Sequence, residues 1–298
     1  MKLKIQKVGI IIKHRHAEAS ALAMEVAHLL LNRGFSVFLC DESAKVLRTV
    51  KPSEKRLIKV VKKSDLQNKV DFIVVLGGDG TYLSAARLMK EKSIPILGVN
   101  MGTLGFLTEV RKDEMHDVLN RILTTGKFSI SERVMLEAQV VRKGKVIFED
   151  LIVNDAVVSK GAIARIIGVK IDVNGEWANT VRADGVILST PTGSTAYSLA
   201  AGGPIVMPQL GCMLLTPICA HGLTQRTLVL PDDVVVEMTL EHRPGHVYLT
   251  IDGQNGIDLK DGDLIRISRF KKHKLKIVKA PSRDYFSLLR EKLNFGGK

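Results

Sequence analysis

The sequence predicts an α/β domain with a doubly wound parallel sheet, followed by a mostly β domain. In the first part of the chain, apolar strand-like runs alternate with helical patterns, which favours parallel strands with helices on both faces. From about residue 128 to residue 267 the segments are short, alternating and β-branched, with turn signals between them. We expect an α/β domain at residues 1–126, a mostly β domain at residues 127–278, and a tail at residues 279–298 that packs back on the first domain.

The elements of the first domain follow from their apolar spacing. Strands are expected at four apolar runs, residues 7–12, 35–39, 72–76 and 94–99. Helices are expected where apolar residues recur every three or four positions, before Gly34, over residues 82–89, and before Gly126. The charged segment at residues 45–63 is weakly helical. In the second domain, Asn174-Gly175 between two β-branched runs predicts a two-residue hairpin. Residues 269–279 resemble a basic strand, and residues 285–293 a final helix.

The carboxyl end of the third strand carries the motif Gly77-Gly78-Asp79-Gly80-Thr81. Its three glycines let the backbone approach a ligand, and the helix start that follows offers N–H groups to phosphate. A carboxylate repels phosphate, so Asp79 requires a separate explanation, such as binding a metal ion or accepting a proton from an attacking hydroxyl. The alternative is a plain strand–turn–helix corner in which Asp79 caps the helix.

Composition restricts the class of protein. Of 298 residues, 45% are hydrophobic and 25% charged, as in ordinary soluble globular proteins. No apolar stretch approaches the roughly 20 residues of a membrane span, and the start shows no signal peptide. The three cysteines form no CxxC pair, which fits a reducing compartment. We therefore expect a cytoplasmic protein with no membrane partner.

The net charge of +13 would attract polyanions, whether nucleic acid, anionic lipid or nucleotide phosphates. Aromatic residues are only 5% of the chain, and no helix-turn-helix, RNP-type or Cys/His finger pattern occurs. We expect no nucleic-acid partner, although a non-catalytic binder of nucleotide or nucleic acid stays open as an alternative.

The second domain has polar clusters of its own. Asn154-Asp155 interrupts an apolar strand, either as a bulge or turn or to hold hydroxyls of a ligand. The tract from Asp184 to Gly203 runs from a strand into a Thr/Gly/Ser loop with small residues, which fits either a closely approached flat ligand or a tightly packed capped helix. No Walker A lysine, no GxGxxG and no GxSxG setting for Ser194 occur. Taken alone, His221 is a core or loop histidine.

Together these motifs resemble those of the NAD kinases, the ATP-dependent enzymes that phosphorylate NAD to NADP. The resemblance covers nearly the whole chain. It rests on Gly77-Gly78-Asp79-Gly80-Thr81, Asn154-Asp155, the Asp184–Gly203 tract with Thr190-Pro191-Thr192-Gly193-Ser194-Thr195-Ala196-Tyr197, Thr216-Pro217-Ile218-Cys219-Ala220-His221, and Asp252-Gly253-Gln254. Lipid kinases and phosphofructokinases carry loops like the first motif, but they have no counterpart of the Asp184–Gly203 tract. A lipid or sugar kinase therefore remains the alternative among enzymes.

The resemblance implies a role for each matching position. Asp79 would accept the proton of the 2′-hydroxyl of the adenosine ribose, with Gly77, Gly78, Gly80 and Thr81 around the phosphates. NAD would be held by Asn154 and Asp155 at its hydroxyls, by Arg165 and Arg182, and by Asp184 on the nicotinamide side. The adenine would be surrounded by Phe106, Thr195, Ala196, Tyr197, Ser198, Leu199 and Ala200, with His221 and Gln254 completing the site.

The resemblance also implies the other participants. ATP would be the phosphoryl donor and NAD the substrate, with a divalent metal ion, Mg²⁺, whose protein ligands the sequence does not identify. The protein would be a homo-oligomer, a dimer or a tetramer, with NAD near a subunit interface.

Overall fold

The computed structural model describes residues 5–14, 16–42, 57–161, 165–242, 245–281 and 283–296. The chain forms two compact units, Met1–Glu132 with Leu275–Lys298, and Arg133–Lys274. The division falls a few residues from the boundaries expected at 126/127 and 278/279. The reason is that β7 (Ile130–Arg133) and β20 (Leu275–Val278) both belong to the sheet of the first unit.

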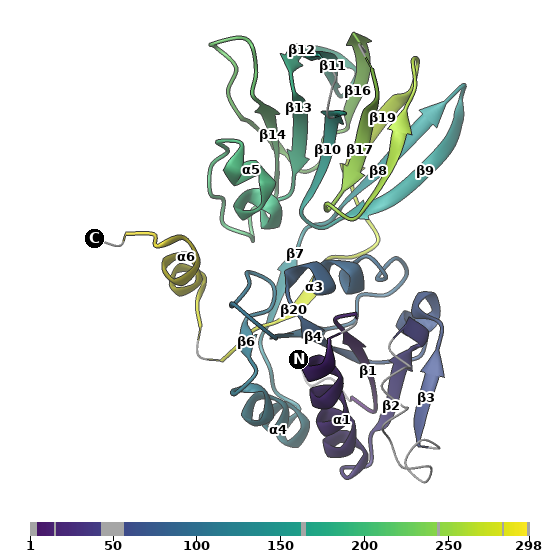
Figure 1. Cartoon of the computed structure of the whole chain (residues 1–298), viewed down its shortest axis with the longest axis vertical. Helices are drawn as coiled ribbons and strands as arrows, with labels where there is room; N and C mark the ends of the chain where they lie inside the picture. Colours follow the sequence, from purple (N-terminus) through teal and green to yellow (C-terminus); the bar gives the residue numbers. More distant parts are fainter. Residues whose placement is uncertain are drawn as a thin grey trace. The chain divides into compact units, whose positions relative to one another are not determined.

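The first unit contains the expected doubly wound parallel sheet (Figure 1). In the described part of the chain, its strands lie in the order β3 (Ile58–Val61), β2 (Ser36–Cys40), β1 (Lys7–Ile12), β4 (Phe72–Gly77), β5 (Ile96–Asn100), β20 and β7, with β6 (Val110–Arg111) beside β5. The pairs from β3 through β5 are parallel. The order reverses between β1 and β4, and ligands of such sheets bind beyond the carboxyl ends of the strands at this point. The Gly77–Thr81 motif begins at the last residue of β4.

The helices of the first unit largely follow the apolar spacing. Among the described residues they are α1 (Ala17–Leu31), α3 (Asp79–Ala86), α4 (Met115–Thr125) and α6 (Tyr285–Leu293), with a 3₁₀ turn at Lys63–Asn68. Gly126 ends α4 in the left-handed conformation, with φ of 63°. The expected weak helix at residues 45–63 is wrong where the structure describes it. Ile58–Val61 forms β3, since its β-branched residues pair with β2; residues 45–56 of that segment lie outside the described residues.

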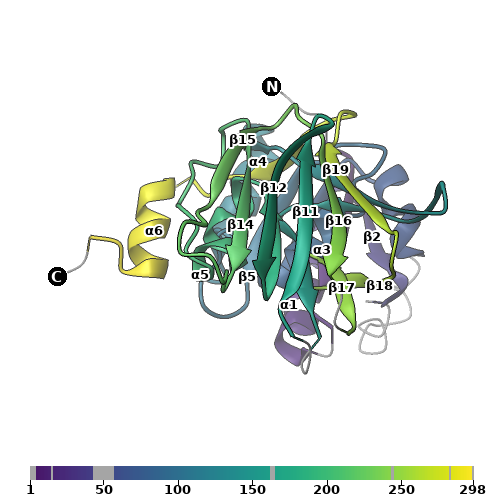
Figure 2. The same cartoon turned by 90° about the horizontal axis from the view of Figure 1, so that it is seen from above.

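The second unit is built from two antiparallel sheets (Figure 2). One has the order β15 (Leu228–Pro231), β14 (Cys212–Ile218), β13 (Gly185–Ser189), β10 (Asp155–Lys160), β17 (Val247–Ile251), β18 (Asn255–Leu259). The other has β12 (Glu176–Ala183), β11 (Ile167–Val173), β16 (Val236–His242), β19 (Leu264–Arg269), β8 (Leu136–Arg142), β9 (Lys145–Ile152). Alternating residues of both sheets form one apolar core.

Two further features of the second unit matter for function. Asn174 and Gly175 have φ of 51° and 82°, so the predicted hairpin turn between β11 and β12 is confirmed. The polar tract after β13 forms a 3₁₀ turn at Thr192–Thr195 and then a single helical turn, α5 (Tyr197–Ala200). No helix among the described residues is long and apolar enough to cross a membrane.

Candidate active site

The loop after β4 makes a tight corner into α3. A Cβ on Gly77 would lie 2.5 Å from Thr81 Oγ1, so the turn requires a glycine there. Gly78 is the N-cap, and a Cβ at this position would have no atom within 4 Å. Its backbone is therefore open to an approaching group. Gly80 is exposed in the first turn of α3, where helix N–H groups attract anions.

Asp79 does not cap α3, because Gly78 holds the cap position and no side-chain cap is made. The Asp79 carboxylate instead binds the loop between β5 and β6. Its Oδ1 accepts hydrogen bonds from the N–H groups of Leu107 and Thr108, both at 3.1 Å, and from Thr108 Oγ1 at 3.0 Å. Its Oδ2 accepts from the Phe106 N–H at 2.8 Å. Oδ1 thus accepts three hydrogen bonds and Oδ2 only one, so Oδ2 is the oxygen that keeps capacity for a further donor.

Asn100, at the end of β5, orders the same loop. Its Nδ2 donates to Thr108 Oγ1 at 2.8 Å, and its Oδ1 accepts from the Gly102 N–H at 2.6 Å. Both Asn100 and Thr108 are buried, so these hydrogen bonds are shielded from water. Asp79 therefore stands at the end of a continuous chain of hydrogen bonds that begins at the neighbouring strand. A cavity of about 700 Å³ adjoins the loop, lined by residues 100–104, Arg111, Lys112, Asp113 and the end of α6.

The second unit has a cavity of about 400 Å³ around Asn154 and Asp155. The other lining residues are Val157, Ser159, Ala196, Tyr197, Thr250, Asp252 and Gly253. Asp252 sits in the β17–β18 hairpin turn with φ of 50°. Its Oδ1 accepts from the N–H groups of Asn154, at 2.7 Å, and Asp155, at 3.1 Å. The break in the strand seen in the sequence is thus held by a carboxylate from a distant hairpin.

Asp155 is buried beside Asp252. Burial and the neighbouring charge of Asp252 raise the pKa of the Asp155 carboxyl to about 7, and a hydrogen bond from the Tyr197 N–H opposes the rise. Near neutral pH a large fraction of this carboxyl is protonated and can donate a hydrogen bond as well as accept one.

The polar tract packs closely against the Asn154-Asp155 segment. Thr190 Oγ1 donates to the Val153 carbonyl at 2.6 Å and accepts from the Gly193 N–H at 3.1 Å. A Cβ on Gly193 would lie 2.1 Å from the Asn154 carbonyl oxygen, so no larger residue fits. The tight-packing interpretation of this tract therefore holds for Thr190 and Gly193, while Ala196 and Tyr197 line the cavity.

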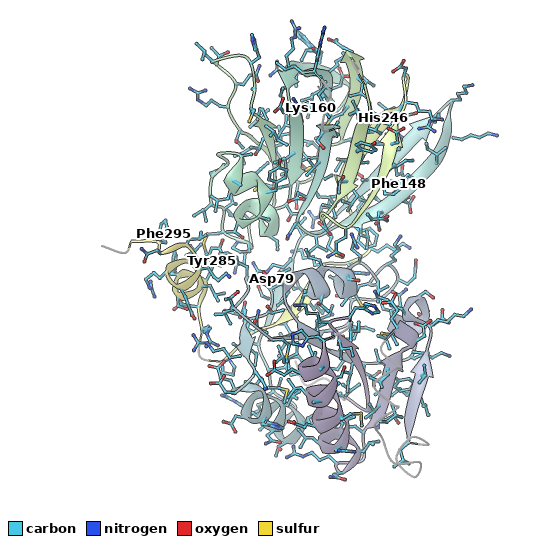
Figure 3. The ribbon with its side chains drawn as sticks, in the orientation of Figure 1. Asp79, Phe148, Lys160, His246, Tyr285 and Phe295 are labelled. Carbon is cyan, nitrogen blue, oxygen red and sulfur yellow. The ribbon has the colours of Figure 1, made fainter. Side chains whose placement is uncertain are left out.

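Other residues of the predicted site lie apart from this cavity. At the cavity end of β13, Ser189 pairs with Asp155; at the other end, Gly185 pairs with Ser159. Asp184 precedes Gly185, so at the rise per residue of a strand it lies roughly 16 Å from Ser189. There Asp184 forms an ion pair with Lys160 at 2.8 Å; Lys160 is labelled in Figure 3. The exposed Arg182 accepts a hydrogen bond at its carbonyl from the His221 N–H at 2.9 Å.

The remaining predicted residues are distributed as follows. Arg165 is exposed, Thr195 and Leu199 are half-buried, Ala200 is exposed, and Gln254 is exposed in the hairpin turn after Asp252. Ser198 is buried, and its Oγ is 2.9 Å from Thr216 Oγ1. Phe106 belongs to the first unit, in the loop that binds Asp79.

Four residues that organise these sites are absent from the predicted set. They are Asn100, Thr108, Asp252 and Gly105, where a Cβ would lie 2.0 Å from Asp79 Oδ1. Asn100 and Gly105 stand in a glycine-rich run at the carboxyl end of a predicted strand, and Asp252 stands in the motif Asp252-Gly253-Gln254. The sequence therefore contained patterns from which these three could have been assigned to the site. Nothing in the sequence marks Thr108. Among the described residues, no group of three or more His, Cys, Asp or Glu side chains is placed to hold a metal ion.

Comparison with known proteins agrees over both units. Residues 8–128 match the ATP-NAD kinase N-terminal domain, and residues 153–280 match the ATP-NAD kinase C-terminal domain. The chain is 42% identical over 292 residues to an NAD kinase of Geotalea daltonii, covering 98% of this chain and 99% of that protein. It is 43% identical over 293 residues to an NAD kinase of Citrifermentans bemidjiense, with the same coverage, 98% and 99%.

The similar solved structures are also NAD or NADH kinases. The yeast NADH kinase complexed with NADH superposes with a TM-score of 0.91 at 28% identity, covering 99% of this chain and 89% of that one. An NAD kinase from Archaeoglobus fulgidus in complex with ATP has a TM-score of 0.70 at 24% identity, covering 96% and 99%, and supports the fold alone. From its two matching domains and its full-length relatives, we conclude that the chain belongs to the NAD kinase family.

Proposed function

We propose that this protein is an NAD kinase, which transfers the γ-phosphoryl group of ATP to the 2′-hydroxyl of the adenosine ribose of NAD. The observation that carries this proposal in the molecule itself is the Asp79 carboxylate. It is fixed by the Phe106–Thr108 loop, stands beside a glycine corner open to phosphate, and keeps acceptor capacity at Oδ2. Family membership then selects NAD, rather than a lipid or a sugar, as the acceptor.

Asp79 acts on the attacking hydroxyl. A ribose hydroxyl is a poor nucleophile, and a carboxylate within hydrogen-bond reach accepts its proton as the new P–O bond forms. Phosphoryl transfer depends mainly on positioning and on neutralising charge, and a carboxylate held by four hydrogen bonds loses little freedom when the substrate arrives.

The phosphates of ATP bind at the glycine corner. Gly78 and Gly80 present backbone without a side chain, and the N-terminus of α3 supplies N–H groups and the positive end of the helix dipole. Mg²⁺ binds proteins through one or two carboxylates together with substrate phosphates and water. The glycine corner leaves room for such an ion, which would be held mainly by the ATP phosphates and water and would neutralise phosphate charge, while Asp79 Oδ2 stays available to the ribose hydroxyl.

The cavity of the second unit binds NAD. Asn154 and Asp155 offer donors and acceptors to hydroxyl or amino groups, and Ala196 leaves room for a flat ring beside Tyr197. Asp252 preserves the cavity by holding the backbone of the Asn154-Asp155 pair. Arg182, Asp184 and His221 lie toward the start of β13, where Asp184 would contact the nicotinamide side of NAD. Arg165 and Arg182 would contact NAD or its phosphate.

The setting follows from the family and the composition. We infer a homo-oligomer, a dimer or a tetramer, located in the cytoplasm, that uses no nucleic acid or membrane partner. The basic surface, with its net charge of +13, serves two polyanionic substrates, since it lowers the repulsion between them.

The test is direct. Purified protein is incubated with ATP, Mg²⁺ and NAD, and NADP is measured with an NADP-specific dehydrogenase. Parallel reactions contain diacylglycerol or fructose 6-phosphate in place of NAD. NADP formation without turnover of the other acceptors supports the proposal. Lipid or sugar phosphorylation at a rate comparable to that with NAD would replace it by the other kinase class, and the absence of any transfer would favour a non-catalytic binder.

A further inference from the structure

The loop that holds Asp79 is in turn contacted by the C-terminal helix. The centroids of the Phe106 and Tyr285 rings are 6.5 Å apart, and the two ring planes meet at an angle of 50°. Figure 3 shows the Tyr285 side of α6 turned toward Asp79, whereas Phe295 lies beyond the helix on the other side. Phe106 is also the residue whose N–H donates to Asp79 Oδ2, at 2.8 Å. One residue therefore connects α6 to the carboxylate.

The segment before α6 is fixed to the same region by Arg283. Its guanidinium donates to both carboxylate oxygens of Glu114, at 2.6 and 2.9 Å, and to the Glu109 carbonyl at 2.9 Å. Hydrogen bonding to Arg283 holds the pKa of the Glu114 carboxyl below its ordinary value. Such a bidentate pair is geometrically specific as well as strong. It ties the start of the C-terminal segment to the end of the loop that begins at Phe106.

The last turn of α6 makes a second attachment, an ion pair between Glu291 and Arg111 of β6. A helix of nine residues is not stable alone in water, so these contacts and the buried Leu288 and Leu289 hold it in place. A capping box between Asp284 and Ser287 fixes its first turn, which places Tyr285 at the first helical position.

We propose that α6 is a positioning element for catalysis, and that Tyr285 orients the Asp79 carboxylate through Phe106. This inference rests on the proposed function of Asp79. Three backbone N–H groups and one hydroxyl must converge on a single carboxylate. All four donors belong to residues 106–108, which form neither helix nor strand. Such a loop keeps one conformation only when packing limits its alternatives. Tyr285 supplies that packing at Phe106, whose N–H donates to Asp79 Oδ2. Oδ2 is the oxygen with capacity for the ribose hydroxyl.

The experiment compares Tyr285→Leu with a matched control, Phe286→Leu. Phe286 is the next residue on the same helix and is 54% exposed. Its ring centroid lies 6.5 Å from that of Tyr285, so Phe286→Leu changes a ring neighbour of Tyr285 but leaves both rings of the Phe106–Tyr285 pair in place. For Tyr285→Leu we expect kcat to fall about 10-fold, with KM for NAD and the melting temperature close to those of the wild type, because misplacing a reacting group lowers turnover. Phe286→Leu should retain wild-type kcat.

A double variant shows whether Tyr285 acts through Asp79. In an Asp79→Asn background the Tyr285→Leu change should lower kcat no further, since residues that act as one unit are non-additive. A full additional 10-fold loss, wild-type kcat in Tyr285→Leu, or an equal loss in Phe286→Leu would each overturn the inference.

Amide hydrogen exchange provides a readout that does not depend on activity. The amides of residues 106–108 should exchange faster in Tyr285→Leu than in the wild type or in Phe286→Leu. If Tyr285→Leu does not fold, Glu291→Gln, which removes the exposed ion pair to Arg111, should produce the same faster exchange. Unchanged exchange in the folded variants would contradict the inference even if the wild type makes NADP. Faster exchange in a protein that makes no NADP would instead reject the proposed function alone.

Discussion

The backbone of Gly105 lies directly against the carboxylate of Asp79. A Cβ on residue 105 would stand 2.0 Å from Asp79 Oδ1 and 2.5 Å from Thr108 Oγ1. No side chain fits in this space. Position 105 therefore needs a glycine because the Asp79 carboxylate lies against it, and not because of the backbone conformation of a turn. The proposed catalytic group and the loop around it therefore constrain each other.

Gly105→Ala should consequently displace Asp79 and lower kcat for NADP formation by about 10²-fold. Gly102→Ala is the control in the same loop, because the nearest atom to a Cβ there is Asn100 Oδ1 at an ordinary 3.9 Å. Steady-state kinetics and melting temperatures of both variants provide the comparison. Equal activity in the two variants would show that the position of Asp79 does not matter.

Gly78→Ala tests whether phosphate approaches the glycine corner. In the protein alone a Cβ on Gly78 meets nothing within 4 Å, so the melting temperature should stay within about 1–2 °C of the wild type. If the ATP phosphates lie against this backbone, the added methyl group should raise KM for ATP by roughly 10-fold or more. An unchanged KM for ATP would place the phosphates elsewhere.

The carboxyl of Asp155 gives the stability a pH dependence. Burial and the charge of Asp252 raise its pKa in the folded protein from the ordinary 3.8 to about 7. Between these two values the folded state binds more protons than the unfolded state, so this group lowers the free energy of unfolding as pH rises from about 4 to 7. Asp155→Asn removes the charge. It should therefore be more stable than the wild type at pH 8, by on the order of 2–4 kcal/mol, while binding NAD more weakly.

Urea denaturation at pH 8 and pH 5 measures this difference. The advantage of Asp155→Asn should shrink at pH 5, because the wild-type carboxyl is then protonated in the folded state. Ser159→Ala, at another lining position of the same cavity, provides a comparison that changes no charge. A variant less stable than the wild type at both pH values would mean that the ionised carboxylate is favoured in the fold.

Ala196→Leu tests the cavity of the second unit. Ala196 lines the space of about 400 Å³, so a leucine should fill it and weaken NAD binding by at least 10-fold in a protein that stays folded. Ala178→Leu is the matched control, since Ala178 is exposed on β12 of the same unit and does not line this cavity. If Ala196→Leu instead loses ~1–3 kcal/mol of stability and keeps its NAD affinity, the position belongs to a packed core.

Most of the fold could be predicted because local patterns coincide with the observed elements. The apolar strand at residues 72–76, the helix before Gly126 and the Asn174-Gly175 hairpin each carry their signal within a few residues. β20 could not be assigned to its sheet in this way, because sequence patterns do not show where a strand finds its partners. Its pairing with β5 joins residues about 180 positions apart in the chain.

The candidate site was predictable to the extent that its residues form contiguous motifs. Asp79 and Asn154-Asp155 were identified from such motifs, and both are now seen at organised positions. The partners that hold them, Thr108 and Asp252, come from other loops 29 and 97 positions away. Only the folded chain shows that Asp79 binds a distant loop and does not cap its own helix.

The measurement that tests the central claim most directly is the turnover of Asp79→Asn with ATP, Mg²⁺ and NAD. The amide oxygen can still accept hydrogen bonds from the Phe106–Thr108 loop, but the side chain can no longer take a proton. We predict that kcat falls by roughly 10²–10⁴-fold, with NAD affinity largely retained and no recovery at excess Mg²⁺. Recovery at excess Mg²⁺ would assign Asp79 to metal binding, and near-wild-type turnover at ordinary Mg²⁺ would contradict its role as the proton acceptor.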